Sequence, residues 1–109
     1  MSGSGSGGGG ERGGTPEAPS DCARFAKDVI LSSPVPVVIS TLNVGDILTL
    51  NFEPDTNQRV IQAVTANGRV AGSVTGEPRL RDCMSQSFEY IAEVLSIQGG
   101  ACRVKVRVK

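Results

Sequence analysis

The chain has 109 residues, with eleven basic and eleven acidic side chains, 39% hydrophobic residues and no histidine. A chain of this length builds one small domain with a modest core. The absence of histidine removes the commonest general base and metal ligand, and no apolar run approaches the roughly 20 residues of a membrane-spanning helix. We therefore expect a non-membrane protein that is not an enzyme and that needs no cofactor or metal.

Residues 1–20 differ in composition from the rest of the chain. They hold eight of the fourteen glycines and no Leu, Ile, Val or aromatic residue. Such a segment buries too little apolar surface to offset the entropy of ordering it. We expect a disordered Gly/Ser-rich tail over residues 1–20 and a single small domain over residues 21–109.

Three cysteines, Cys22, Cys83 and Cys102, make an odd number and show no C-x-x-C spacing. This pattern argues against a disulfide framework and against a zinc site. Free cysteines are among the most buried residue types. The sequence therefore predicts reduced thiols that pack in the core of a cytoplasmic protein.

Residues 21–33 are predicted to form a short helix. Five side chains spaced at i, i+3, i+4, i+7 and i+8 share one stripe: Cys22, Phe25, Ala26, Val29 and Ile30. Ser20 or Asp21 can cap the start, and Pro34 ends the helix because the residue before a proline disfavours helical geometry. The stripe packs either on the domain itself or on a partner.

The next two segments are predicted to be strands. Residues 35–41 are rich in β-branched side chains, and Pro36 favours an edge position because it lacks an amide donor. Residues 47–52 show a period of two, which predicts a half-buried strand with Leu48, Leu50 and Phe52 toward the core.

Residues 59–66 and 69–75 are predicted to form a hairpin around Asn67 and Gly68. A type I′ turn needs positive φ at both central residues, and Asn-Gly favours such a turn. Gly72 lies inside the second strand, where glycine marks a bulge, a sharp bend or the close approach of another backbone. A small barrel needs such bends to close.

The C-terminal third is predicted to contain a helix and a second hairpin. Pro78 suits the first turn of a helix over residues 78–87, whose inner face carries Leu80, Cys83 and Met84. Strands over residues 88–97 and 102–109 are joined through a Gly-Gly turn. Together these elements predict a mainly β (α+β) fold, a small six-stranded β-barrel-like domain with one or two short helices.

Three features follow one another in the middle of the chain. They are a loop from Glu53 and Pro54 to Asn57, an apolar strand with Ala63 and Val64, and a turn and strand over residues 67–72. Over about residues 45–108 this pattern resembles a HIRAN-type domain, the small modified barrel found beside helicase and nuclease modules. The resemblance implies capture of a single-stranded DNA end. The family tends to stack that end on aromatic residues of its opening strand, and residues 34–42 here contain no aromatic residue.

The best functional candidate is the last strand, which is strictly amphipathic. From Arg59 onward the chain carries eight basic and four acidic residues, a net charge of +4. Cations at alternate positions of a strand are roughly 6.6–6.8 Å apart and can follow a phosphate backbone. We expect a non-catalytic module that binds single-stranded or end-type DNA through the basic face of the last strand, formed by Arg103, Lys105, Arg107 and Lys109. Arg59 and Arg69, which flank the first hairpin, can extend this face.

Two other hypotheses remain open. Lys and Arg on an edge strand also prevent edge-to-edge aggregation while the valines of that strand fill the core. Neutral total charge and few aromatic residues fit a protein-interaction or assembly module as well. Such a module is a small subunit of a larger complex or a homo-oligomer that pairs edge strands such as residues 35–41.

Overall fold

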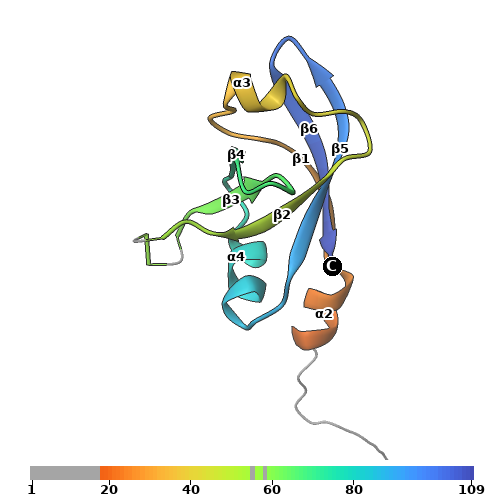
Figure 1. Ribbon diagram of the computed structural model, residues 1–109. Helices are drawn as coiled ribbons and strands as arrows, with labels where there is room; N and C mark the ends of the chain where they lie inside the picture. The colour runs from red at the N-terminus through yellow and green to blue at the C-terminus, as the bar shows by residue number, and fades with distance from the viewer. Residues whose placement is uncertain (1–17, 55, 58) are drawn as a thin grey trace, which may run out of the picture.

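The computed structural model describes residues 18–54, 56–57 and 59–109, with side chains from Asp21 onward. Three short helices and six strands follow one another in these residues (Figure 1): α2 (Ala18–Arg24), β1 (Ala26–Ile30), α3 (Pro36–Ile39), β2 (Ile47–Phe52), β3 (Ile61–Val64), β4 (Val70–Val74), α4 (Pro78–Ser85), β5 (Tyr90–Gln98) and β6 (Ala101–Val108). The predicted tail lies outside the described residues up to residue 17, and α2 takes in its last three residues.

The six strands form one antiparallel sheet that curls into a half-barrel. The strand order is β1-β6-β5-β2-β3-β4, so every neighbouring pair runs antiparallel. Figure 1 shows α2 and α4 at one end of the half-barrel, near the C-terminus, and α3 at the other end. The predicted fold class, a small mainly β barrel-like domain with six strands, is confirmed.

The two edge strands of the sheet meet at one point. Just after β1, Ser32 pairs with Ser73 of β4 in an antiparallel bridge. Three residues further along the chain, the amide of Val35 donates to the carbonyl of Ala71 at 2.9 Å. Gly72 permits this approach, because a Cβ at its position would lie 3.0 Å from the Ser32 carbonyl oxygen. Of the three alternatives predicted for Gly72, the close approach of another backbone is observed, and the pairing register with β3 also shifts next to it, between Ala63 and Val64.

The core lies on the inner face of the sheet. Leu48 and Leu50 are buried as predicted, and Phe52 is partly buried against them. Val104 and Val106 of β6 are completely buried. Helix α4 covers one end of the core with Leu80 and Cys83.

The helix predicted over residues 21–33 is wrong beyond Arg24. Residues from Ala26 to Ile30 form β1, which pairs along its whole length with β6. The helical stripe is not used, since Ala26 is exposed and Ile30 is 55% exposed. A helix here would leave one side of β6 without backbone partners, and such open strand edges are unfavourable.

The strand predicted over residues 35–41 is also wrong. This segment forms the one-turn helix α3, with Pro36 in its first turn and the Ser40 amide donating to the Pro36 carbonyl at 2.9 Å. Proline fits a first helical turn because its fixed φ is helical and its missing amide needs no partner there. The edge strands of the sheet are β1 and β4 instead.

Both predicted hairpins are present, although one turn differs in type. Gly99 and Gly100 have φ of +56° and +87°, as a tight two-residue turn requires. Gly68 has φ +85°, but Asn67 does not share the positive φ that a type I′ turn demands. The Thr65 and Arg69 backbones pair around a three-residue loop, a geometry in which glycine alone takes the left-handed position.

Candidate interaction face

The basic strand β6 lies inside the sheet and not at its edge. It pairs with β1 on one side and with β5 on the other. The hypothesis that its cations protect a sheet edge is therefore wrong, because the neighbouring strands already satisfy its backbone. The cations instead occupy the convex outer side of the half-barrel, since the alternate residues Val104 and Val106 point into the core.

We call this side the outer face and define it by cross-strand register. Directly opposite residues of an antiparallel pair point to the same side of the sheet. The outer face is made of alternate residues of five strands: Ala26, Asp28 and Ile30 of β1, Arg103, Lys105 and Arg107 of β6, Ile91, Glu93 and Ser96 of β5, Ile47, Thr49 and Asn51 of β2, and Gln62 and Val64 of β3. Lys109 just after β6 and Glu89 just before β5 continue it, since the Lys109 amide donates to the Glu89 carbonyl.

Acidic side chains flank the basic row on both sides. Lys105 stands directly opposite Asp28 on β1 and directly opposite Glu93 on β5. Opposite residues in such pairs have Cβ atoms roughly 4.5–5.5 Å apart, close enough for charges to interact. The centre of the outer face is thus a negative, positive, negative series across three strands.

Two of the four cations form ion pairs. The Arg107 Nη2 atom lies 3.4 Å from Glu93 Oε1, and the Lys109 Nζ atom lies 3.3 Å from Glu89 Oε1. Within the part of the chain that is described, Arg103 and Lys105 form no ion pair. Four cations and three carboxylates, Asp28, Glu89 and Glu93, leave the outer face with a net charge of only +1.

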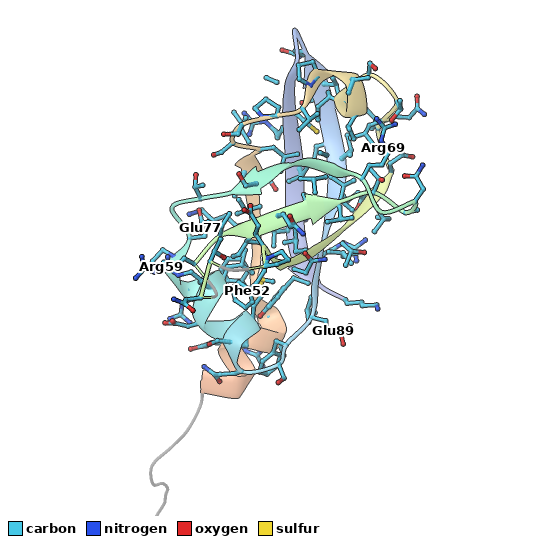
Figure 2. All side chains as sticks on the ribbon, turned by 60° about the vertical axis from the view of Figure 1, so that its left-hand side comes forward. Phe52, Arg59, Arg69, Glu77 and Glu89 are labelled. Atoms are coloured by element: carbon cyan, nitrogen blue, oxygen red, sulfur yellow. A yellow bond between two sulfur atoms is a disulfide. The ribbon has the colours of Figure 1, made fainter. Side chains whose placement is uncertain are left out.

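The hairpin arginines do not join the basic row. Arg59 lies just before β3 and Arg69 lies just after the turn that follows it, so the length of β3 separates them (Figure 2). Strands β5 and β2 stand between β3 and β6, a spacing of roughly 14 Å along the sheet. The predicted site residues form one row of four and two separate positions.

Apolar side chains share the outer face with these charges. Ile30, opposite Arg103, is 55% exposed, and Ile47, opposite Glu93, is 43% exposed. Ile91 and Val64, both half-buried, lie on either side of Thr49. The three helices lie at the two ends of the half-barrel (Figure 1), so no helix of the described residues covers this mixed apolar and charged surface.

A shallow hollow extends the outer face beyond Ile47. It has a volume of about 650 Å³ and lies between the loop before β2 and the β3–β4 turn. Its lining mixes apolar and polar side chains: Thr41, Leu42, Asp46, Ile47, Leu48, Thr65, Ala66 and Asn67. Such a hollow can receive a side chain from a binding partner.

The predicted state of the cysteines is wrong for two of the three. Cys22 of α2 and Cys83 of α4 form a disulfide with a Cα–Cα distance of 5.5 Å. Three cysteines without C-x-x-C spacing gave no sign in the sequence that the fold brings Cys22 and Cys83 together. Cys102 is free and completely buried, and burial raises the pKa of its thiol.

Across the described residues, no group of three or more His, Cys, Asp or Glu side chains is placed to hold a metal ion. No helix in the described part of the chain is long and apolar enough to cross a membrane.

Sequence reasoning identified the basic row but missed the acidic residues that neutralise it. Glu93 alternates in the sequence with the buried residues of β5, so its position on the outer face could have been derived. Asp28 could not, because residues 21–33 were predicted to be a helix. Only the pairing of β1 with β6 brings Asp28 opposite Lys105.

Comparison with protein families and with curated proteins gives no match. A crystal structure of a protein from Lactobacillus plantarum is similar to this chain, with a TM-score of 0.62 and 17% sequence identity. The similarity covers 78% of this chain and 97% of that chain. At this identity it concerns the fold alone.

Proposed function

We propose that this domain is a non-catalytic module that binds a protein partner through the outer face. The observation that carries the proposal is the Asp28–Lys105–Glu93 series, in which charges of opposite sign alternate across neighbouring strands. A surface of this kind is complementary to a protein surface that also carries both signs of charge. A phosphate backbone offers only negative charge.

The apolar side chains of the outer face support the same function. Interfaces between proteins combine apolar anchors with arginine and a polar rim. Ile30, Ile47 and Ile91 supply such anchors, and Arg103 and Arg107 lie beside them. The hollow next to Ile47 adds a concave site to an otherwise convex face.

The experiment is affinity capture from extracts of the source cells with three versions of the full chain as bait. These are the natural chain, Ile47→Asp, and the matched control Val37→Asp, whose side chain on α3 is 61% exposed and lies off the outer face. Quantitative mass spectrometry identifies captured proteins. Each candidate is then purified, and its affinity for the three baits is measured directly.

We expect to find a partner that binds the natural chain and Val37→Asp with equal affinity. The same partner should bind Ile47→Asp at least about tenfold more weakly, because an interface anchor is worth about 1.4 kcal/mol or more. Circular dichroism checks that each bait is folded. Equal affinity for Ile47→Asp, or the absence of any specific partner, contradicts the proposal.

Nucleic-acid binding is the second candidate function, and the resemblance to HIRAN-type domains favours it. The observation on its side is that Arg103 and Lys105 are exposed cations on neighbouring outer positions of β6. Fluorescence anisotropy with single-stranded and double-stranded oligonucleotides tests it. Binding that weakens with salt by about 0.7 log units per neutralised phosphate, and that Arg103→Glu/Lys105→Glu abolishes, would establish this function in place of protein binding.

A further inference from the structure

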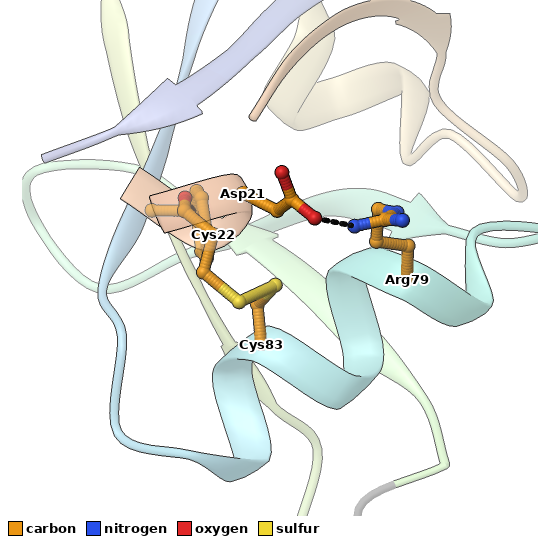
Figure 3. Close-up of polar contacts among 5 residues, drawn as sticks. Asp21, Cys22, Arg79 and Cys83 are labelled. Carbon is orange, nitrogen blue, oxygen red and sulfur yellow. Dashed lines mark hydrogen bonds and ion pairs between the residues drawn. A yellow bond between two sulfur atoms is a disulfide. The ribbon is translucent and has the colours of Figure 1, made fainter. Parts of the chain in front are cut away.

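We propose that the Cys22–Cys83 disulfide is a redox-controlled clamp that holds the N-terminal helix α2 on the end of the half-barrel, and that a dithiol releases this helix. The clamp lies at the end of the half-barrel near the C-terminus, and it does not depend on the proposed function. Figure 3 shows the disulfide between the two helices, beside the ion pair of Asp21 with Arg79.

Few contacts other than the disulfide hold the part of α2 whose side chains are described, Asp21 to Arg24. The hydroxyl of Tyr90, which is completely buried, donates a hydrogen bond to the Cys22 carbonyl. Phe25, just after the helix, packs edge-to-face on the Tyr90 ring with centroids 5.8 Å apart. The Asp21–Arg79 pair is 3.5 Å long and exposed, and exposed pairs of this kind contribute little.

The helix itself is too short to persist without its neighbours. It has seven residues, and isolated helices of fewer than about 12 residues are marginal in water. Between Asp21 and Arg24, Cys22 is the only buried residue of α2. Apart from the chain itself, which continues through Phe25 into β1, the covalent bond to Cys83 is therefore the strongest link that the described residues of this helix make to the rest of the domain.

A hollow on the surface lies against both cysteines of the disulfide. It has a volume of about 350 Å³ and is lined by Cys22, Pro78, Arg79, Asp82, Cys83 and Gln86. Both cysteines are otherwise nearly closed to solvent, at 3% and 2% exposure. Because both cysteines line the hollow, it is the route by which a thiolate would reach the disulfide in the folded protein.

The redox step is thiol–disulfide exchange with a dithiol as the reductant. Its thiolate attacks one of the two Sγ atoms, the Sγ–Sγ bond breaks, and a mixed disulfide forms. The second thiol of the dithiol then displaces the protein sulfur and closes a cyclic disulfide. In total, two electrons and two protons pass from the dithiol to the thiols of Cys22 and Cys83.

Limited trypsin digestion of the full chain tests the clamp, with dithiothreitol as the dithiol. Arg24 at the end of α2 is the cleavage site that reports release, and Lys105 and Arg107 inside β6 report opening of the sheet. We expect reduction to raise the rate of cleavage after Arg24 by roughly thirtyfold or more, the lower end of what a disulfide of this size stabilises. In the reduced protein, cleavage inside β6 should stay far slower than cleavage after Arg24, because β6 is exposed only when the whole domain unfolds.

Two outcomes of the digestion would overturn the proposal. No increase after Arg24 shows that noncovalent contacts hold α2 and overturns the proposal. Cleavage in β6 that is as fast as cleavage after Arg24 in the reduced protein shows that reduction opens the whole domain, which also overturns it. The variant Cys102→Ala, which keeps the disulfide but removes the third thiol, must behave as the natural chain does.

A second measurement tests the access route through the hollow. Asp82 lines it and repels an incoming thiolate. Replacing it in Asp82→Asn should raise the rate of reduction by dithiothreitol by roughly twofold to fivefold, the effect of one exposed charge at short range. An unchanged rate means that the thiolate does not enter through this hollow, and the route is then wrong.

Discussion

Ser32 and Ser73 exchange two backbone hydrogen bonds, of 2.7 and 2.9 Å, and so join the two edges of the sheet. Their side chains add to this junction: Ser32 Oγ lies 2.7 Å from Thr75 Oγ1, and Ser73 Oγ donates to the Ser32 carbonyl at 3.3 Å. The ion pair of Lys27 with Glu77, at 2.9 Å, crosses the same gap. Polar contacts therefore link the edge strands of the half-barrel, while the apolar core fills its interior.

The first prediction concerns Gly72, which lies against this junction. A methyl group in Gly72→Ala would stand 3.0 Å from the Ser32 carbonyl oxygen and 3.2 Å from Leu31 Cβ. Backbone cannot move aside as a flexible side chain can, so we expect a loss of about 1–3 kcal/mol in the free energy of unfolding. Urea denaturation measures the loss. Hydrogen exchange at the Ser32 and Ser73 amides should become faster, and unchanged protection there would contradict the explanation.

The second prediction concerns the global effect of the disulfide. Cys22 and Cys83 are 61 residues apart in the sequence, so their bond restricts a large loop of the unfolded chain. We expect Cys22→Ser/Cys83→Ser to lower the free energy of unfolding by about 2–4 kcal/mol. Chemical denaturation with and without reductant measures this. The stability of the double variant should not respond to reductant, whereas that of the natural chain should.

The third prediction concerns the charge series on the outer face. Lys105→Glu places three carboxylates in a row with Asp28 and Glu93, and each like-charged opposite pair costs roughly 0.2–1 kcal/mol. We expect lower stability at low salt and a smaller loss at high salt, where screening is stronger. Adding Asp28→Lys to Lys105→Glu should restore part of the loss. A loss that is independent of salt would point to another cause.

The fourth prediction concerns stability in alkaline solution. Burial raises the pKa of the Cys102 thiol and of the Tyr90 hydroxyl above their ordinary values of 9.0 and 10.0. Above those values the unfolded chain has lost protons that the folded chain retains, so stability falls as the pH rises. Below about pH 9 neither group affects the slope.

Two variants separate these contributions. Cys102→Ala should flatten the decline between about pH 9 and 10, and Tyr90→Phe should flatten it above pH 10. Tyr90→Phe should also lower stability by about 0.5–1.5 kcal/mol at neutral pH, because it removes the hydrogen bond to the Cys22 carbonyl. Thermal or urea denaturation at several pH values measures both effects. An equally steep decline in both variants would show that other groups control it.

The location of the protein in the cell stays a prediction, and one of the arguments for it no longer holds. The expectation of a cytoplasmic protein depended in part on three reduced thiols. The Cys22–Cys83 disulfide removes that argument, because structural disulfides are rare in the reducing cytoplasm. Determining the redox state of these two cysteines in the source cells, by alkylation and mass spectrometry, addresses the question directly.

The sequence by itself determined the elements whose signals are local. The alternation of Leu48 and Leu50, the valines of β6, the turn glycines Gly99 and Gly100, and the helix that Pro78 begins all have their predicted structure. In each of them, burial on one side or a required backbone conformation selects one structure without help from distant residues. These signals were sufficient for the fold class.

The tertiary structure decided whatever depended on partners far away in the sequence. Residues 26–30 are a strand because β6 offers them backbone hydrogen bonds, although their spacing also suits a helix. The same pairing places Asp28 opposite Lys105 and turns a basic row into a face of mixed charge. Cys22 reaches Cys83 because α2 and α4 pack at the same end of the half-barrel. Local periodicity contains no information on which distant residues meet, and in this protein those meetings determine both the charge of the candidate site and its redox chemistry.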